Sequence, residues 1–125
     1  MKDAIVVGLA LHGWRKDRVV DAFSKIFETA VAPKQASIWL SFDKECSRWW
    51  LTNGDFTSAG ENVLAGTYAI FPIGMSQTAI EQTVAGLVDE MEQKIAGAYS
   101  VRLLGYPDEN VSNTFAGRSS PPALL

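Results

Sequence analysis

The sequence predicts one small α+β domain in which helices pack on a single face of a mainly antiparallel sheet. The chain has 125 residues, of which 47% are hydrophobic and 20% charged, a composition typical of a globular domain. Segments that alternate apolar and polar residues, as half-buried strands do, are mixed with segments of helical periodicity. Two of the alternating segments are separated by only four residues, which indicates an antiparallel hairpin.

The first third of the chain predicts a strand followed by a helix. Residues 4–11 are apolar on both faces and rich in β-branched side chains, a pattern typical of a strand covered on two sides. Residues 17–31 carry apolar side chains at helical spacing, and Pro33 would end that helix. The expected order therefore begins β-α.

The hairpin is the most specific structural prediction. Pairing Phe42 with Ser47 leaves residues 43–46 as the loop and keeps the apolar side chains on one face. The same register sets Trp39 opposite Trp50 on the other face. The inner face then gathers Ile38, Leu40, Trp49 and Leu51.

The remaining elements predict a loop, a strand, a helix and a last strand. Residues 53–66 are rich in turn formers and predict a loop, with one helical turn at residues 61–64. Residues 66–74 (GTYAIFPIG) read as a strand, and residues 99–104 as the last one.

The second helix should start at Ser76 or Thr78, where Thr78 and Glu81 have the spacing of a capping box, and should stop at Gly97. Its expected buried stripe consists of Ile80, Val84, Leu87, Val88, Met91 and Ile95.

The expected order is β-α-β-β-β-α-β, a ferredoxin-like split β-α-β pattern that forms a two-layer sandwich with helices on one face. Residues 1–107 would form this single domain. Residues 108–125 are rich in Asn, Ser, Gly and Pro and predict a loosely ordered C-terminal tail.

Charge and cysteine content narrow the function classes. The net charge is −3 and only Arg15, Lys16 and Arg18 form a basic cluster, which disfavours nucleic acid as a partner. No apolar run approaches the roughly 20 residues of a membrane span, so no membrane association is expected. The single cysteine, Cys46, rules out a disulfide within the chain and favours a reducing, cytoplasmic location.

The open face of the predicted hairpin is the first candidate site. Trp39 and Trp50 would lie there beside Arg48, and exposed indoles of this kind mark an interface or a ligand surface. Three readings remain open: self-association as a homodimer, stacking of a ligand, and cover by the 53–66 loop or the C-terminal tail. An outward sheet edge or the segment 4–11 could also carry a dimer interface.

A second candidate site lies at residues 8–15, between the first strand and the first helix. Two glycines there have the spacing of a phosphate-binding loop, but Trp14 and Arg15 replace the residues that would hold phosphate and metal. His12, Trp14 and Arg15 could still take a carboxylate or phosphate group at a helix N-terminus. The favoured alternative is that Gly13 simply makes the turn and His12 caps or packs locally. One histidine and one cysteine cannot build a structural zinc site, so neither metal nor cofactor is expected.

These observations favour a small binding module that self-associates and binds a small molecule or a protein partner. Two alternatives stay open. One is an enzyme of the dimeric α+β barrel type, with a cleft lined by His12, Trp14, Tyr68 and Arg102. The other is an acidic inhibitor or immunity-type protein that uses Asp89, Glu90 and Glu92 against a basic target.

The predicted faces of the hairpin can be tested by truncating each tryptophan. Trp49→Ala should destabilise the monomer far more than Trp50→Ala, because only Trp49 shares the face of the core. Loss of a buried aromatic side chain typically costs about 3 to 5 kcal/mol. Equal losses in denaturant melts, with the oligomeric state controlled, would contradict the assignment of faces.

Overall fold

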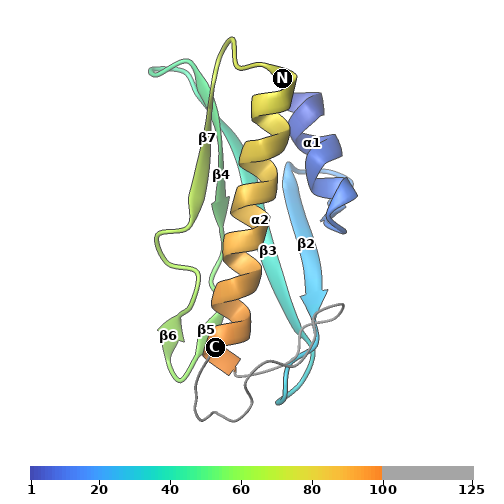
Figure 1. Ribbon diagram of the computed structural model, residues 1–125, viewed down its shortest axis with the longest axis vertical. Helices are drawn as coiled ribbons and strands as arrows, with labels where there is room; N and C mark the ends of the chain where they lie inside the picture. The colour runs from blue at the N-terminus through green and yellow to red at the C-terminus, as the bar shows by residue number, and fades with distance from the viewer. Residues whose placement is uncertain (100–125) are drawn as a thin grey trace.

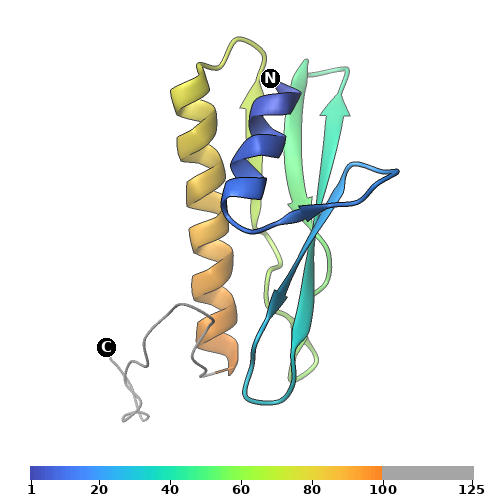
Figure 2. The same cartoon turned by 90° about the vertical axis from the view of Figure 1, so that its right-hand side faces the viewer.

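The computed structural model describes residues 1–99, which form two layers: a twisted sheet and a pair of helices packed on one of its faces (Figures 1 and 2). The elements are α1 (Lys2–Leu11), β1 (Arg15–Lys16), β2 (Ala22–Phe27), β3 (Lys34–Asp43), β4 (Arg48–Asn53), β5 (Thr57–Ser58), β6 (Glu61–Asn62), β7 (Tyr68–Pro72) and α2 (Gln77–Tyr99).

The main sheet has the order β1-β2-β3-β4-β7, and every neighbouring pair is antiparallel. Strands that follow one another along the chain are therefore neighbours in space, apart from the small β5-β6 hairpin inserted before β7. The predicted α+β class is confirmed. The ferredoxin-like order is not confirmed, because the first two predicted elements are of the other type.

Residues 4–11, predicted as a strand, belong to the helix α1. A short run that is apolar all round fits a buried strand and a buried helix equally well, and periodicity alone does not separate them. In the folded chain Ile5, Gly8 and Leu9 form the buried stripe at helical spacing, while Val7 and Leu11 stay exposed.

Residues 17–31, predicted as a helix, contain a turn and the strand β2. The carboxylate of Asp17 accepts hydrogen bonds from the amides of Val19 (2.8 Å) and Val20 (3.1 Å), which closes a turn where the helix was expected to start. Phe23 and Phe27 are both buried. Their spacing of four suits a helix turn and also two strand periods, so the pattern was ambiguous.

The hairpin of β3 and β4 has the predicted faces but a shifted register. Leu40 pairs with Leu51, and Trp50 lies opposite Ser41 rather than Trp39. The loop holds four residues, 44–47, because Asp43 closes it: its Oδ1 accepts the amides of Glu45 and Cys46. A shift of two leaves every side chain on its expected face.

The second helix is confirmed with its complete buried stripe: Ile80, Val84, Leu87, Val88, Met91 and Ile95. The hydroxyl of Ser76 accepts the amide of Ala79, so Ser76 caps the helix rather than Thr78. The helix runs through Gly97 to Tyr99. The turn expected at residues 61–64 is instead part of the β5-β6 hairpin and the turn after it. The predicted strand over 99–104, apart from Tyr99, and the predicted tail lie outside the described residues.

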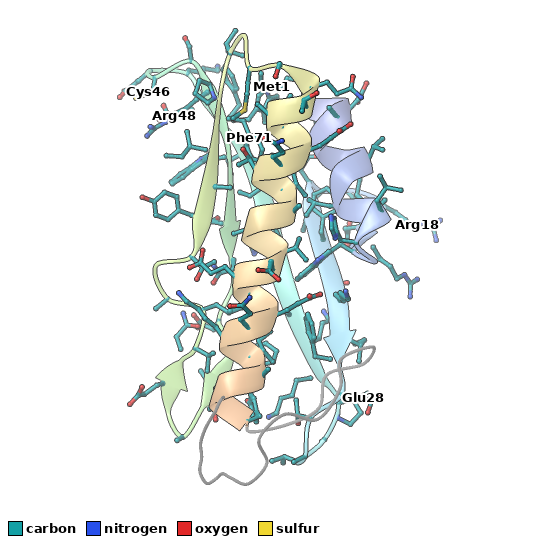
Figure 3. The ribbon with its side chains drawn as sticks, in the orientation of Figure 1. Met1, Arg18, Glu28, Cys46, Arg48 and Phe71 are labelled. Atoms are coloured by element: carbon teal, nitrogen blue, oxygen red, sulfur yellow. The ribbon has the colours of Figure 1, made fainter. Side chains whose placement is uncertain are left out.

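The core lies between the sheet and the helices. Phe71 of β7 and Leu51 of β4 are fully buried against α2, and Figure 3 shows Phe71 between its strand and that helix. The helices α1 and α2 approach each other closely at Gly8. A Cβ atom at this position would lie 3.3 Å from Cγ1 of Val84, a contact so tight that the valine side chain would have to shift.

Two helical glycines offer a matched test of this packing. Gly86 of α2 has open space around it, so Gly86→Ala should raise stability by about 1 kcal/mol through helix propensity. Gly8→Ala gains the same propensity but crowds the stiff side chain of Val84, and it should bring no gain or a loss. Urea unfolding midpoints measure both. Equal stabilisation by the two changes would mean that the helices are not in close contact at Gly8.

Candidate functional site

Within residues 1–99 neither helix covers the second face of the sheet, here called the open face, and its side chains line up across three strands. In an antiparallel sheet, residues directly opposite each other share a face, so the strand registers define rows of neighbours. Read from β3 across β4 to β7, the rows are Asp43–Arg48–Pro72, Ser41–Trp50–Ile70 and Trp39–Thr52–Tyr68.

Large apolar side chains are exposed on this face. Trp39 is 49% exposed, Tyr68 is 56% exposed, and Ile26 of β2 is 52% exposed. Trp50 and Ile70 are half-buried and lie side by side in the row next to that of Trp39 and Tyr68. Exposed aromatic groups on a sheet face are typical of a surface that binds a ligand or another protein.

An open pocket of about 400 Å³ lies over β4, β7 and the segment that joins β6 to β7. Its volume is within the range of small-molecule sites. Trp50 and Ile70 come from its central row, with Arg48 at one end and Tyr68 at the other. The lining residues are Arg48, Trp50, Thr52, Asn53, Asn62, Ala65, Gly66, Thr67, Tyr68 and Ile70.

Hydrogen bonds fix the segment between β6 and β7, residues 63–67, which forms one wall of the pocket. Asn62 Oδ1 accepts the amides of Phe56 and Leu64, each at 3.2 Å. Asn53 donates to the carbonyl of Thr67. The Thr67 hydroxyl accepts from Lys94 of α2 at 2.8 Å. This wall is therefore tied both to β4 and to the helix layer, and it is largely preformed.

Arg48 is held by an acidic neighbour at the hairpin end of the pocket, near Cys46 (Figure 3). Its Nε lies 3.4 Å from Asp43 Oδ2, an ion pair, and this buried atom has no hydrogen-bonding partner among the described residues. The pKa of Asp43 is lowered, first by the hydrogen bond from the amide of Cys46 and last by the charge of Arg48. Asp43 is therefore ionised at neutral pH and orients the guanidinium.

The pocket can bind a flat molecule that carries negative charge. Arg48 is the only charged residue among the described residues that line it. A guanidinium recognises carboxylate, sulfonate or phosphate groups through paired hydrogen bonds. Trp50 and Tyr68 supply aromatic surface, while Thr52 and Tyr68 add hydroxyl groups.

The structure brings two of the predicted site residues together. Arg48 and Trp50 both line the pocket. Trp39 lies on the same open face, opposite Thr52, but is not part of the pocket lining. The predicted direct pairing of Trp39 with Trp50 is wrong, because Asp43 closes the hairpin loop and Trp50 is opposite Ser41.

Of the other three predicted site residues, His12 and Trp14 lie in the segment between α1 and β1, and Arg15 lies on β1, at the sheet edge away from β7. His12 follows the C-terminus of α1, so the expected helix N-terminus is absent, and the ammonium of Lys25 binds the His12 carbonyl at 2.8 Å. Trp14 is a core residue against Phe27, with ring centroids 6.2 Å apart. Arg15 is exposed on β1.

The residues named for the two alternative functions lie on different parts of the fold. His12 follows α1 in the helix layer, whereas Tyr68 lies on the open face and lines the pocket there, and Arg102 falls outside the described residues. Residues 1–99 contain no group of three or more His, Cys, Asp or Glu side chains that could hold a metal. Within α2, Glu92 bonds to Lys25 at 3.3 Å, while Asp89 and Glu90 remain exposed.

On the β7 side of the pocket, sequence reasoning named only Tyr68, and it placed that residue in a cleft with His12. The strand itself was predicted, and its alternation already puts Tyr68, Ile70 and Pro72 on one face. A useful signal was available, because no charged residue occurs between Asn62 and Ile80. The sequence did not say that β7 lies beside β4, and without this neighbour the pocket has only one wall.

Comparison of the chain with protein-family models, with curated protein sequences and with solved structures returned no match. In the described part of the chain, neither helix has the length and apolar character needed to cross a membrane. The geometry of the open face is therefore the basis for any statement about function.

The hairpin closure at Asp43 can be tested through its pH dependence. Its pKa is lowered in the folded chain, so its stabilising contribution is present above the ordinary value of 3.8 and is lost as the pH falls through the lowered value. Asp43→Asn keeps an oxygen acceptor but does not titrate. The wild type should therefore be more stable than this variant at neutral pH, and the difference should shrink in acid.

Urea midpoints of both proteins over a pH series measure this difference. The other carboxylates are common to both proteins and cancel in the comparison. A difference that stays constant down to the acid limit would show that Asp43 does not close the hairpin as a carboxylate.

Proposed function

We propose that the protein is a non-catalytic binding module that takes a small aromatic anion in the pocket on its open sheet face. The observation that carries this proposal is the combination of one cation, Arg48, with the aromatic walls Trp50 and Tyr68 around a volume of about 400 Å³. The anionic group of the ligand would bind the guanidinium, and its ring would lie against the indole. The wall between β6 and β7, where Lys94 donates a hydrogen bond to Thr67, limits the length of the ligand.

The charge of Arg48 favours an anionic ligand over a cationic or an apolar one. A cationic ligand would meet the guanidinium with like charge, and a wholly apolar one would leave it without an anionic partner beyond Asp43. The cytoplasmic location expected from the single cysteine remains part of the proposal.

The binding experiment uses three probes: 2-naphthoate, its neutral counterpart 2-naphthamide, and acetate, which has the charge without the ring. Chemical-shift changes in amide NMR spectra report both the site and the affinity. We expect 2-naphthoate to bind with the largest shifts at Trp50, Tyr68 and the side chain of Arg48. Naphthamide and acetate should bind more weakly, because each lacks one of the two recognised groups.

Arg48→Gln should lower the affinity for 2-naphthoate about 10- to 100-fold, which corresponds to roughly 1.5 to 3 kcal/mol for a charge-assisted hydrogen bond. Its affinity for naphthamide should barely change. Arg15→Gln is the matched control, because it removes the same charge from an exposed position on β1. Equal effects of the two changes, or shifts that map away from β4 and β7, would rule out the proposed site.

Self-association through the open face is a second candidate, favoured by the exposed indole of Trp39. It competes with ligand binding, because Trp50 would serve both. Trp39→Ser and Trp50→Ser separate the two functions. Only the change at Trp50 should weaken ligand binding, since Trp39 does not line the pocket, whereas an interface centred on the open face should lose affinity with either change.

A further inference from the structure

The strand β7 ends the sheet, and within residues 1–99 it pairs with β4 alone. Its outer side therefore carries backbone groups that can bond to another strand. An exposed edge of this kind is a template for strand pairing unless charge, shortness or a cover protects it.

The hydrogen bonds next to β7 show which of its backbone groups point outward. The amide of Ile73 donates to the carbonyl of Ser47, so this opposed pair is hydrogen-bonded. Bonded and non-bonded pairs alternate along an antiparallel ladder. Phe71 and Ala69 therefore bond toward β4. The amides and carbonyls of Tyr68 and Ile70, and the carbonyl of Pro72, point away from the sheet.

The two edges of the sheet differ in protection. The outer strand at one edge, β1, has only two residues, Arg15 and Lys16, and both are exposed and charged. The other edge, β7, has five residues and none is charged. Within the five residues of β7, the protective feature is Pro72, which lacks an amide proton but keeps its carbonyl acceptor.

We infer that β7 pairs with β7 of a second copy of the chain, antiparallel and about a two-fold axis at Ile70. In this register each Ile70 amide donates to the Ile70 carbonyl of the other copy, and each Tyr68 amide donates to the carbonyl of Pro72. The two sheets join into one, with both open faces on the same side. This inference goes beyond the proposed ligand binding and does not depend on it.

A second copy suits this edge because β7 is complementary to itself. The two-fold register places Tyr68 against Pro72 and Ile70 against Ile70, so no like charges meet. It also extends the rows of the open face. Tyr68 of the second copy continues the row of Arg48 and Pro72 and adds an aromatic side chain at the cationic end of the pocket. The pocket of each copy is thereby completed by the other.

A single pair of five-residue strands is a small interface, so the dimer should be weak, with a dissociation constant on the order of 100 μM. Sedimentation of the full chain from about 10 μM to about 500 μM should follow a monomer–dimer equilibrium. The amides of Tyr68 and Ile70 should exchange with solvent more slowly as the concentration rises.

Of the backbone hydrogen-bonding groups, Ile70→Pro removes only an outward-pointing amide, so it should give a folded monomer, while Ile70→Val keeps the amide and should still dimerise. Circular dichroism and thermal melts confirm that each variant is folded. A second pair of variants tests the two-fold axis through charge. Ile70→Lys and Ile70→Glu should each be monomeric, because like charges would meet across the axis. Mixing the two variants should give a heterodimer, because opposite charges then meet.

Three outcomes would overturn the inference. A wild type that stays monomeric at every concentration leaves the edge without this occupant. A dimer that survives Ile70→Pro lies elsewhere, as does a dimer that Trp39→Ser abolishes. The ligand-binding result for Arg48→Gln does not affect this test, because the oligomeric state is measured without any ligand.

Discussion

The structure depends on the burial of a single apolar stripe, that of α2, against one face of an antiparallel sheet. The stripe covers the inner side of the central strands, and Leu51 and Phe71 are fully buried beneath the helices. The helix α1 packs beside α2 through Gly8 and Val84, so both helices lie on the same face. Within residues 1–99 this arrangement leaves the second face of the sheet without a helix, and the pocket and the β7 edge lie on that face or beside it.

The hairpin closure at Asp43 connects this architecture to the chemistry of the open face. Its carboxylate closes the loop through the amides of Glu45 and Cys46, and its second oxygen faces Arg48. The same group therefore sets the strand register and positions the one cation of the pocket. A turn that closed one residue earlier would move Arg48 and Trp50 along the sheet relative to β3, and the rows that face a ligand would have a different composition.

Ligand binding and edge pairing would share the strand β7. Tyr68 and Ile70 present side chains to the pocket and backbone groups to the free edge. The uncharged edge of β7 suits pairing with a second copy, whereas Arg48 in the pocket suits an anion. The two proposals use different atoms, backbone groups for pairing and side chains for the ligand, so they do not compete. Ligand binding should favour pairing of the β7 edges, and pairing should favour ligand binding, if Tyr68 of a second copy contacts the bound ligand.

The sequence by itself determined the α+β class, the stripe of α2 and which side of the hairpin is buried, because these follow from local periodicity. It misassigned residues 4–11 and 17–31, whose apolar spacing suits a helix and a strand equally, and only packing against α2 and the turn at Asp17 decided between them. Arg48 and Trp50, which line the pocket, were named from the sequence because outward-facing aromatic and cationic side chains are visible in a strand pattern. The other wall of the pocket was not found, since the pairing of β4 with β7 joins segments that are distant along the chain, and such pairings are fixed by tertiary contacts rather than by local pattern.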